Sequence, residues 1–307
     1  MRLFDFLFGK KDGTSSPEKV TEPIEPMQKT TKDEIDYLEG VEVAPGMVMP
    51  RAFAEQWDKI KETKKQCITI KATASDDVLL TQSKFGHYPY LPAGYEYPKD
   101  EEGRYMYPLA QINFSEVPPL AGYPSSGYLQ FYISAFDDLY GMDFDDLRLQ
   151  KNFRVLYLED DVIKDSMTDF SFLEEALHND MNPVYKPHAL RFSATDEYVG
   201  FGDIRYEKRV GEFDIEAVVE QYPELTKELE GYMWSNFQLS GHKIGGYAFF
   251  TQGDPRSGET EDYLLLLQID TDEHIMWGDS GVGNFFIHPD DLAKKDFSKV
   301  MYTWDCC

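Results

Sequence analysis

The chain has 307 residues, 42% of them hydrophobic, and its 56 acidic and 30 basic side chains give a formal net charge of −26. This composition predicts a globular protein with a large core. Such an excess of negative charge repels nucleic acid and anionic lipid, so we expect no nucleic-acid binding; it favours cationic partners, such as basic protein surfaces or metal ions.

Targeting signals and cysteine usage predict a cytoplasmic protein. No stretch approaches the roughly 18 apolar residues that a transmembrane helix needs. The apolar start MRLFDFLF is too short for a secretory signal, and no cleavage site follows it. The three cysteines, Cys67, Cys306 and Cys307, are odd in number and two of them are adjacent, which argues against a disulfide framework.

Residues 1–32 are predicted to form a short amphipathic hook followed by a disordered linker. Apolar side chains recur at helical spacing between Leu3 and Phe8, and Lys10 and Lys11 follow them. From residue 12 onward the segment is rich in Pro, Thr, Ser, Glu and Lys, a composition typical of disorder. The hook would dock weakly to a membrane or a partner, or it would be a frayed terminus.

The body of the protein is predicted to span residues 33–307. A helix is expected over residues 52–63, because Pro50 suits a first-turn position and apolar side chains follow at helical spacing. A second helix is expected over residues 215–230, interrupted by Pro223.

Four short blocks from the first part of the chain recur in the same order in the last part. KFGHYPY is matched by KIGGYAF, LAQIN by LLQID and GYLQFYI by GVGNFFI, and DDL with VLY is matched by DDL with VMY. The distance between partners shrinks along the chain, as loop deletions would produce. The paired blocks are residues 84–90 and 243–249, 109–113 and 266–270, 127–133 and 281–287, and 145–160 and 290–305.

Each block is short, rich in aromatic or β-branched residues, and bounded by Gly, Pro or Asp, which is typical of strands in a meander. We therefore expect an α+β fold, mainly an antiparallel sheet with internal duplication and with helices packed outside. The two related β-rich halves would cover about residues 67–160 and 232–307, joined by an insert of about residues 161–231.

The same blocks resemble a known family. SKFGHYPYLP, YPLAQINF, GYLQFYIS, IMWGDSGVGNFFI and SKVMYTWDC are together similar to the YwqG-like family of bacterial proteins. The resemblance covers about residues 67–307 and implies a duplicated α+β fold. It implies no established activity, because that family is uncharacterised, and no catalytic residue is carried over from it.

The most acidic segment is the predicted loop DDLYGMDFDD at residues 137–146. It is interpreted as a partner-facing acidic patch, as a calcium site built from its carboxylates, or as a solvated loop. Two aromatic rings in the loop would anchor a partner, unless they tuck back into the core. The candidate residues are Asp137, Asp138, Tyr140, Asp143, Phe144, Asp145 and Asp146.

Acidic residues continue beyond the loop, and the segment 137–175 holds 12 acids and four bases. If these charges share one face, they would steer a basic protein towards it. Among the alternatives, any two carboxylates that meet in a cleft could perform acid–base catalysis.

A second candidate site lies at Trp277 and Asp279, which would line a pocket unless Trp277 is a core residue. The neighbouring string GDSG, residues 278–281, matches the nucleophile motif of serine proteases. It enters the repeated block 281–287, so we interpret it as a turn before a strand, and the histidine context of a catalytic triad is missing.

These observations predict a non-enzymatic acidic protein that binds a basic protein partner, most concretely an immunity or antitoxin-type protein. The first alternative is an enzyme of unknown type with a carboxylate-lined cleft between the repeats. The second is a module modulated by calcium. No other cofactor is expected.

Overall fold

The computed structural model describes residues 35–160, 165–211, 218, 220–237 and 239–307. The predicted hook and linker of residues 1–32 therefore lie outside the described residues. The chain divides into two compact units. The smaller contains Met1–Glu62 and Arg209–Asn236, and the larger contains Thr63–Lys208 and Phe237–Cys307.

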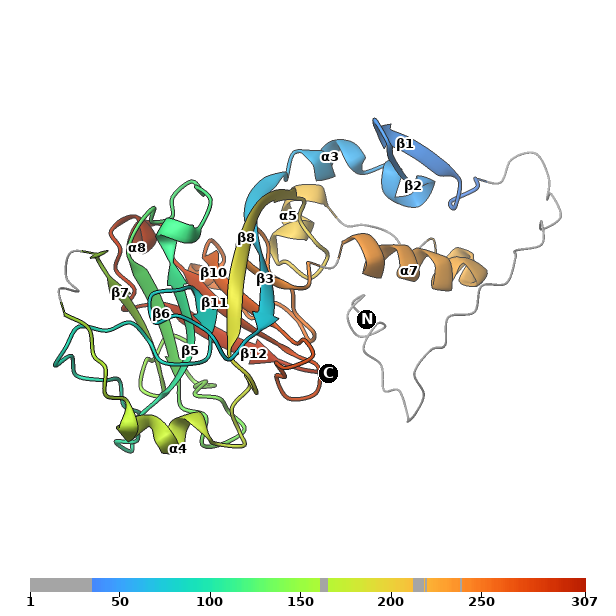
Figure 1. Cartoon of the computed structure of the whole chain (residues 1–307). Coiled ribbons are helices and arrows are strands. Elements are labelled where there is room, and N and C mark those ends of the chain that lie inside the picture. Colours follow the sequence, from blue (N-terminus) through green and yellow to red (C-terminus); the bar gives the residue numbers. More distant parts are fainter. Residues whose placement is uncertain (1–34, 161–164, 212–217, 219, 238) are drawn as a thin grey trace. The chain divides into compact units, whose positions relative to one another are not determined.

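The larger unit is built on one ten-stranded sheet in the order β12-β11-β10-β9-β3-β8-β4-β5-β6-β7 (Figure 1). Every neighbouring pair is antiparallel, which confirms the predicted sheet type. The strands are β3 (Lys65–Ala74), β4 (Lys84–Phe85), β5 (Tyr107–Asn113), β6 (Tyr128–Ile133), β7 (Phe153–Leu158), β8 (His188–Glu197), β9 (His242–Gly245), β10 (Leu264–Asp270), β11 (Val282–Ile287) and β12 (Met301–Asp305).

The two central strands, β3 and β8, pair with each other and join the two ends of the sheet. β3 and β8 pair over ten residues, from Lys65 opposite Glu197 to Ala74 opposite His188. The other edge of β3 pairs with β9, and the other edge of β8 pairs with β4. The segment 161–231, predicted to be a linking insert, thus supplies a central strand of the sheet.

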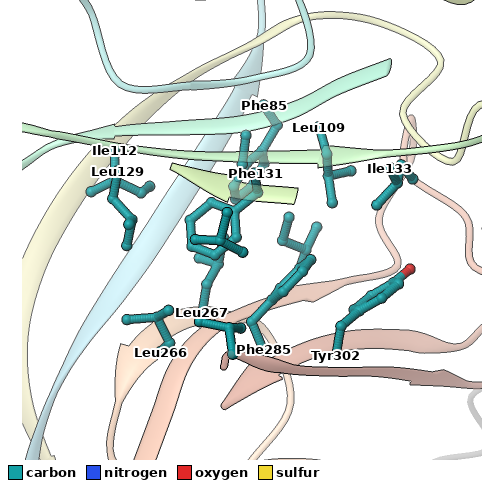
Figure 2. Close-up of a cluster of buried hydrophobic side chains, with 14 of the residues drawn as sticks. Phe85, Leu109, Ile112, Leu129, Phe131, Ile133, Leu266, Leu267, Phe285 and Tyr302 are labelled. Carbon is teal, nitrogen blue, oxygen red and sulfur yellow. The ribbon is translucent and has the colours of Figure 1, made fainter. Parts of the chain in front are cut away.

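The sheet curls so that β6 and β7 face β11 and β12 across the main core. The ring of Phe131 lies 4.7 Å from that of Phe285, and the ring of Phe153 lies 5.2 Å from that of Tyr302. Figure 2 shows Leu109 and Phe131 on one wall, pointing towards Leu267 and Phe285 on the other. Burial of this apolar surface is the main driving force that holds the two walls together.

The opposite face of β5 and β6 is also covered, which explains why these strands are buried throughout rather than at alternate positions. All residues of both strands are buried. A second cluster packs there, built from the loop before β5, from β6 and β7, and from the segment that leads into α4 (Glu174–Leu177); it contains Leu91, Tyr97, Met106, Tyr128, Tyr132, Leu158, Phe170 and Leu173.

Two glutamines, one on β5 and one on β10, make closely similar hydrogen bonds. Gln111 on β5 donates through Nε2 to the carbonyls of Leu80 (3.0 Å) and Gln82 (2.9 Å). Its Oε1 accepts the backbone N–H of Tyr90 at 2.7 Å. The fully buried amide therefore ties a loop that lies before β5 to the strand.

Gln268 on β10 makes a similar set of hydrogen bonds. Its Nε2 donates to the carbonyls of Leu239 (2.9 Å) and Gly241 (2.7 Å), and its Oε1 accepts the N–H of Phe249 at 2.8 Å. Each glutamine thus satisfies three backbone groups that would otherwise be buried without partners.

Short helices accompany the sheet, and among the described residues no helix has the length and apolar character that a membrane crossing requires. Besides α4, the larger unit contains α8 (Pro289–Ala293), and α5 (Arg205–Val210) spans the boundary between the units. Pro289 occupies the first turn of α8, and His288 Nδ1 accepts the N–H of Asp290 at the helix start. The 3₁₀ turns of the larger unit are Phe114–Glu116, Ser171–Leu173 and Gly258–Thr260.

The smaller unit contains a hairpin, β1 (Gly40–Ala44) with β2 (Met47–Pro50), and helices that differ from the prediction. The helix expected over residues 52–63 is two short ones, α2 (Arg51–Ala54) and α3 (Trp57–Lys61), because the chain turns between them. Of the range 215–230, residues 215–217 and 219 lie outside the described part. In the described remainder, a 3₁₀ turn at Pro223–Leu225 is followed by α7 (Thr226–Asn236).

Candidate functional site

The acidic loop lies between β6 and β7, and its centre has a demanding backbone conformation. Tyr140 and Gly141 both have positive φ angles, of 49° and 79°. A Cβ atom on Gly141 would lie 2.1 Å from the carbonyl oxygen of Asn152, so only glycine fits there. The chain therefore reverses sharply at this point, with acidic residues on both sides of the reversal.

The centre of the loop is fixed to β12 and to the turn before β11. The Tyr140 ring packs edge-on against Trp304 (4.9 Å between centroids) and Trp277 (5.6 Å). The indole N–H of Trp304 donates to the carbonyl of Leu139 at 2.8 Å, and the Tyr302 hydroxyl donates to the carbonyl of Tyr140 at 3.1 Å. The loop is thus held in one place by aromatic packing and two backbone contacts.

Several carboxylates stabilise the loop itself. Asp137 accepts the N–H of Leu139 at 3.1 Å, and Asp143 accepts the N–H groups of Asp145 (2.9 Å) and Asp146 (3.1 Å). Such contacts are typical of aspartate in turns. No group of three acidic, histidine or cysteine side chains among the described residues is arranged to hold a metal ion.

The charged side chains remain largely on the surface, together with apolar ones. Asp137, Asp138, Asp145 and Asp146 are exposed, and Asp143 is half-buried. Three large apolar or aromatic side chains are exposed with them: Phe144 (72%), Tyr185 (59%) and Leu139 (39%). Of the two predicted anchors, Phe144 therefore projects into solvent, whereas Tyr140 tucks back against the core.

The two candidate sites predicted from the sequence meet at Tyr140. The pKa of its hydroxyl is raised, mainly by burial and further by the nearby Tyr185, Asp138 and Cys306, while a hydrogen bond with the backbone of Gly278 acts in the opposite direction. The acidic loop, the turn at Gly278 and the C-terminal residues therefore belong to one face of the larger unit, which we call the acidic face.

Trp277 and Asp279 do not line a common pocket, because one is buried and the other is exposed. The Trp277 side chain is fully buried in the main core, and a Cβ on Gly283 would lie 2.5 Å from its ring. Its Nε1 has no hydrogen-bond partner among the residues that the structure describes. Asp279 is exposed, and its carbonyl accepts the N–H of Cys307 at 3.3 Å. Trp277 is therefore a core residue, and Asp279 adds a charge to the acidic face.

The GDSG string forms the turn before β11, as predicted. Gly278 and Ser280 have positive φ angles of 52° and 61°, and the N–H of Gly281 donates to the carbonyl of Trp277 at 2.8 Å. The backbone requirement of this turn explains the glycines of the motif.

The acidic residues that follow β7 are partly engaged in local contacts. Glu159 pairs with Lys295 at 2.6 Å, Asp160 accepts the N–H of Gly127 at 3.2 Å, and Asp169 accepts the N–H of Ser171 at 3.0 Å. Asp161 lies outside the described residues.

A pocket of about 460 Å³ lies elsewhere, between β7 and the segment that follows α8. Its lining includes Gln150, Arg154, Tyr157, Lys295, Asp296 and Phe297. Only one of its lining residues is a carboxylate, so it is not the carboxylate-lined cleft predicted between the repeats. This pocket was not predicted from the sequence, because Arg154 and Lys295 are far apart in the chain and no pattern in their repeated blocks indicates that they share a cavity.

Comparison with known proteins gives one family. Residues 83–306 match a domain of unknown function, DUF1963, which covers more than half of the chain. No curated protein matches the sequence.

Proposed function

The chain belongs to the DUF1963 family, and because that family has no assigned activity, we propose a function from the surface of the molecule: a non-enzymatic binding protein whose acidic face captures a basic protein. Neutralisation of a basic toxin by an immunity or antitoxin-type protein is the most concrete form of this role. The observation that carries the proposal is the fixed acidic loop, in which exposed carboxylates surround the exposed Phe144.

The composition of this face suits protein recognition. Interfaces commonly combine a few aromatic anchors with charged residues at the rim. Phe144 and Tyr185 would supply the anchors, and the loop carboxylates would steer a basic partner and set its orientation. Tyr140 and Trp304 hold the loop, so binding would require little ordering of the backbone, which favours affinity.

The alternatives have less support. A carboxylate-lined catalytic cleft would need several acidic side chains in one cavity, and the pocket at β7 offers Asp296 beside Arg154 and Lys295. A calcium module would need converging oxygen ligands, whereas Asp137 and Asp143 accept N–H groups of their own loop.

We further propose that β4–β7 and β9–β12 arose by duplication, as in the YwqG-like proteins that the sequence resembles. Besides the two glutamines, a third amide pair supports this: Gln130 donates to the carbonyl of Tyr90 and Asn284 to that of Phe249, both at 2.8 Å. The strand order also reads the same outward from β3 and β8. A superposition of the two strand sets that failed to bring these amides together would contradict the duplication.

We propose that the protein acts in the cytoplasm and does not bind nucleic acid. Cys67, Cys306 and Cys307 are free thiols, which suits a reducing compartment. The net charge of −26 opposes contact with phosphate backbones. Cell fractionation that placed the protein in an oxidising compartment would contradict the first of these proposals.

The test of the binding role is affinity capture with variants of equal net charge. The loop variant replaces Asp137, Asp138, Asp143, Asp145 and Asp146 by Asn. The control variant neutralises five exposed carboxylates outside the acidic segment 137–175, Asp76, Asp77, Glu96, Asp180 and Asp262. Proteins captured from the source organism at low and high salt are identified by mass spectrometry.

A basic protein that is retained by wild type and by the control, but lost from the loop variant and at high salt, supports the proposal. Equal loss from both variants would assign the effect to net charge alone. Retention of no basic protein by wild type would count against a binding role for the acidic face.

A further inference from the structure

The pocket beside β7 has the size of a small-molecule site. Its volume of about 460 Å³ lies within the range of roughly 300–1,000 Å³ typical of such sites. It is formed by the edge strand β7 on one side and by the turn after α8 on the other. Gln150 ties the two sides together, because its Nε2 donates to the carbonyl of Phe297 at 2.7 Å and its Oε1 accepts the N–H of Val155 at 2.9 Å.

Arg154 lines this pocket with a positive charge that the described residues do not balance. Its Nη2 donates to the carbonyl of Gln150 at 3.1 Å, while its Nε is buried and has no hydrogen-bond partner in the described part of the chain. No carboxylate of the described residues forms an ion pair with it. The half-buried guanidinium of Arg154 has lost water contacts that no protein group of the described residues replaces. A bound anion would supply the missing hydrogen bonds and the opposite charge.

The one carboxylate in the lining is already engaged. Asp296 accepts the N–H of Ser298 at 3.0 Å. Hydrogen bonds from the side chain and backbone of Ser298 lower the pKa of Asp296, and Lys299 and Lys294 lower it further. Asp296 is therefore held by its own turn, and it does not pair with Arg154.

A second cation stands at the same pocket. Lys295 has a left-handed backbone with φ of 56°, and its ammonium lies 5.0 Å from the centre of the Tyr157 ring while it also pairs with Glu159. Besides the polar Gln150 and Ser298, the remaining lining is apolar or aromatic and comes from Val155, Leu156, Tyr157 and Phe297. An uncompensated arginine beside apolar and aromatic walls suits a ligand that joins an anionic group to an apolar body.

We propose that this pocket binds a small organic anion, a phosphate ester or a carboxylate, through Arg154, with its apolar part against Tyr157 and Phe297. Such a site is distinct from the acidic face, because none of its lining residues belongs to the acidic loop. On a protein of this net charge, an unpaired cation supplies the local attraction that an anion needs. Bound ligand would bridge β7 and the α8 turn and would stabilise the larger unit.

The test uses phenyl phosphate, benzoate and inorganic phosphate as probes, with binding to the full chain measured by titration calorimetry and by the shift in unfolding temperature. The variants are Arg154→Gln, Arg154→Lys and the control Arg191→Gln, an exposed arginine on β8. We expect at least one aromatic probe to bind more tightly than inorganic phosphate. Arg154→Gln should weaken that binding about tenfold or more, while Arg191→Gln leaves it unchanged.

The relative affinity of phenyl phosphate and benzoate then separates a phosphate site from a carboxylate site. Near-ultraviolet circular dichroism checks that each variant is folded, and Arg154→Lys, which keeps the charge, should retain weakened binding if Arg154→Gln does not fold. Absence of binding for all three probes would overturn the proposal, as would equal binding to wild type and a folded Arg154→Gln.

Discussion

The indole N–H of Trp304 donates to the carbonyl of Leu139 at 2.8 Å, so the last strand of the chain holds the most acidic loop in place. The same indole packs against Tyr140, the next residue of that loop. The position of the acidic loop therefore depends on a side chain that is itself uncharged.

Replacing Trp304 by Phe should loosen the loop without removing any charge. The substitution keeps an aromatic ring against Tyr140 but removes the hydrogen bond to Leu139, and we expect it to lower the free energy of unfolding by about 1 kcal/mol. Urea unfolding measures this change. If the loop binds a basic partner, affinity should fall as well, and unchanged stability together with unchanged affinity would contradict the anchoring role.

Replacing Gly141 by Ala should be far more damaging than the same change at Gly103. Both glycines have positive φ angles, of 79° and 81°, but an added Cβ would meet the carbonyl oxygen of Asn152 at 2.1 Å in the first case and open space in the second. We expect about 1 kcal/mol of destabilisation at Gly103, from backbone strain alone, and more than about 2 kcal/mol at Gly141. Thermal and urea unfolding of both variants measure the two changes in stability. Similar losses of stability at Gly103 and Gly141 would show that the loop adapts to the added Cβ.

The buried Lys84 should make stability depend on pH in the alkaline range. Its ammonium donates to the carbonyls of Leu79 (2.9 Å) and Leu80 (2.8 Å), and burial lowers its pKa to about 7, with Glu116 acting in the opposite direction. The unfolded chain binds the proton up to a pH of about 10, whereas the folded chain releases it near 7. The unfolded state therefore binds more protons between these values, and stability should rise with pH across this window.

The measurement compares wild type with Lys84→Met from pH 6 to pH 10, because subtraction removes the contributions of other titrating groups. The free energy of unfolding of wild type should rise relative to the variant by an amount on the order of a few kcal/mol. A difference that stays constant across this range would show that Lys84 remains charged in the folded protein.

The strands of the sheet were predictable where local sequence determined them. β5 and β6 are buried along their whole length because both faces are covered, and the repeated blocks indicated β4–β7 and β9–β12 as strands. β8 was missed, since much of its sequence HALRFSATDE is half-buried or exposed and no repeat marks it. Its central position depends on pairing with β3, a long-range contact that no local pattern records.

The candidate site was predictable only in its charges. Composition alone identified the acidic loop. That Tyr140 packs against the core while Phe144 is exposed depends on Trp277 and Trp304, which are distant in sequence. Trp277 was open to two interpretations because an indole beside an aspartate occurs both in cores and in pockets. The unpaired Arg154 had no signal, because the lack of a partner is a property of three-dimensional packing.

The pairing of β3 with two strands that come much later in the chain also bears on folding during synthesis. A ribosome releases β3 long before β8 and β9, the two strands that flank it. Throughout that interval the nascent chain carries a ten-residue strand whose two edges are open to any other extended segment. The centre of the sheet is therefore completed late in synthesis, and we expect a chaperone that shields β3 during translation to raise the yield of folded protein.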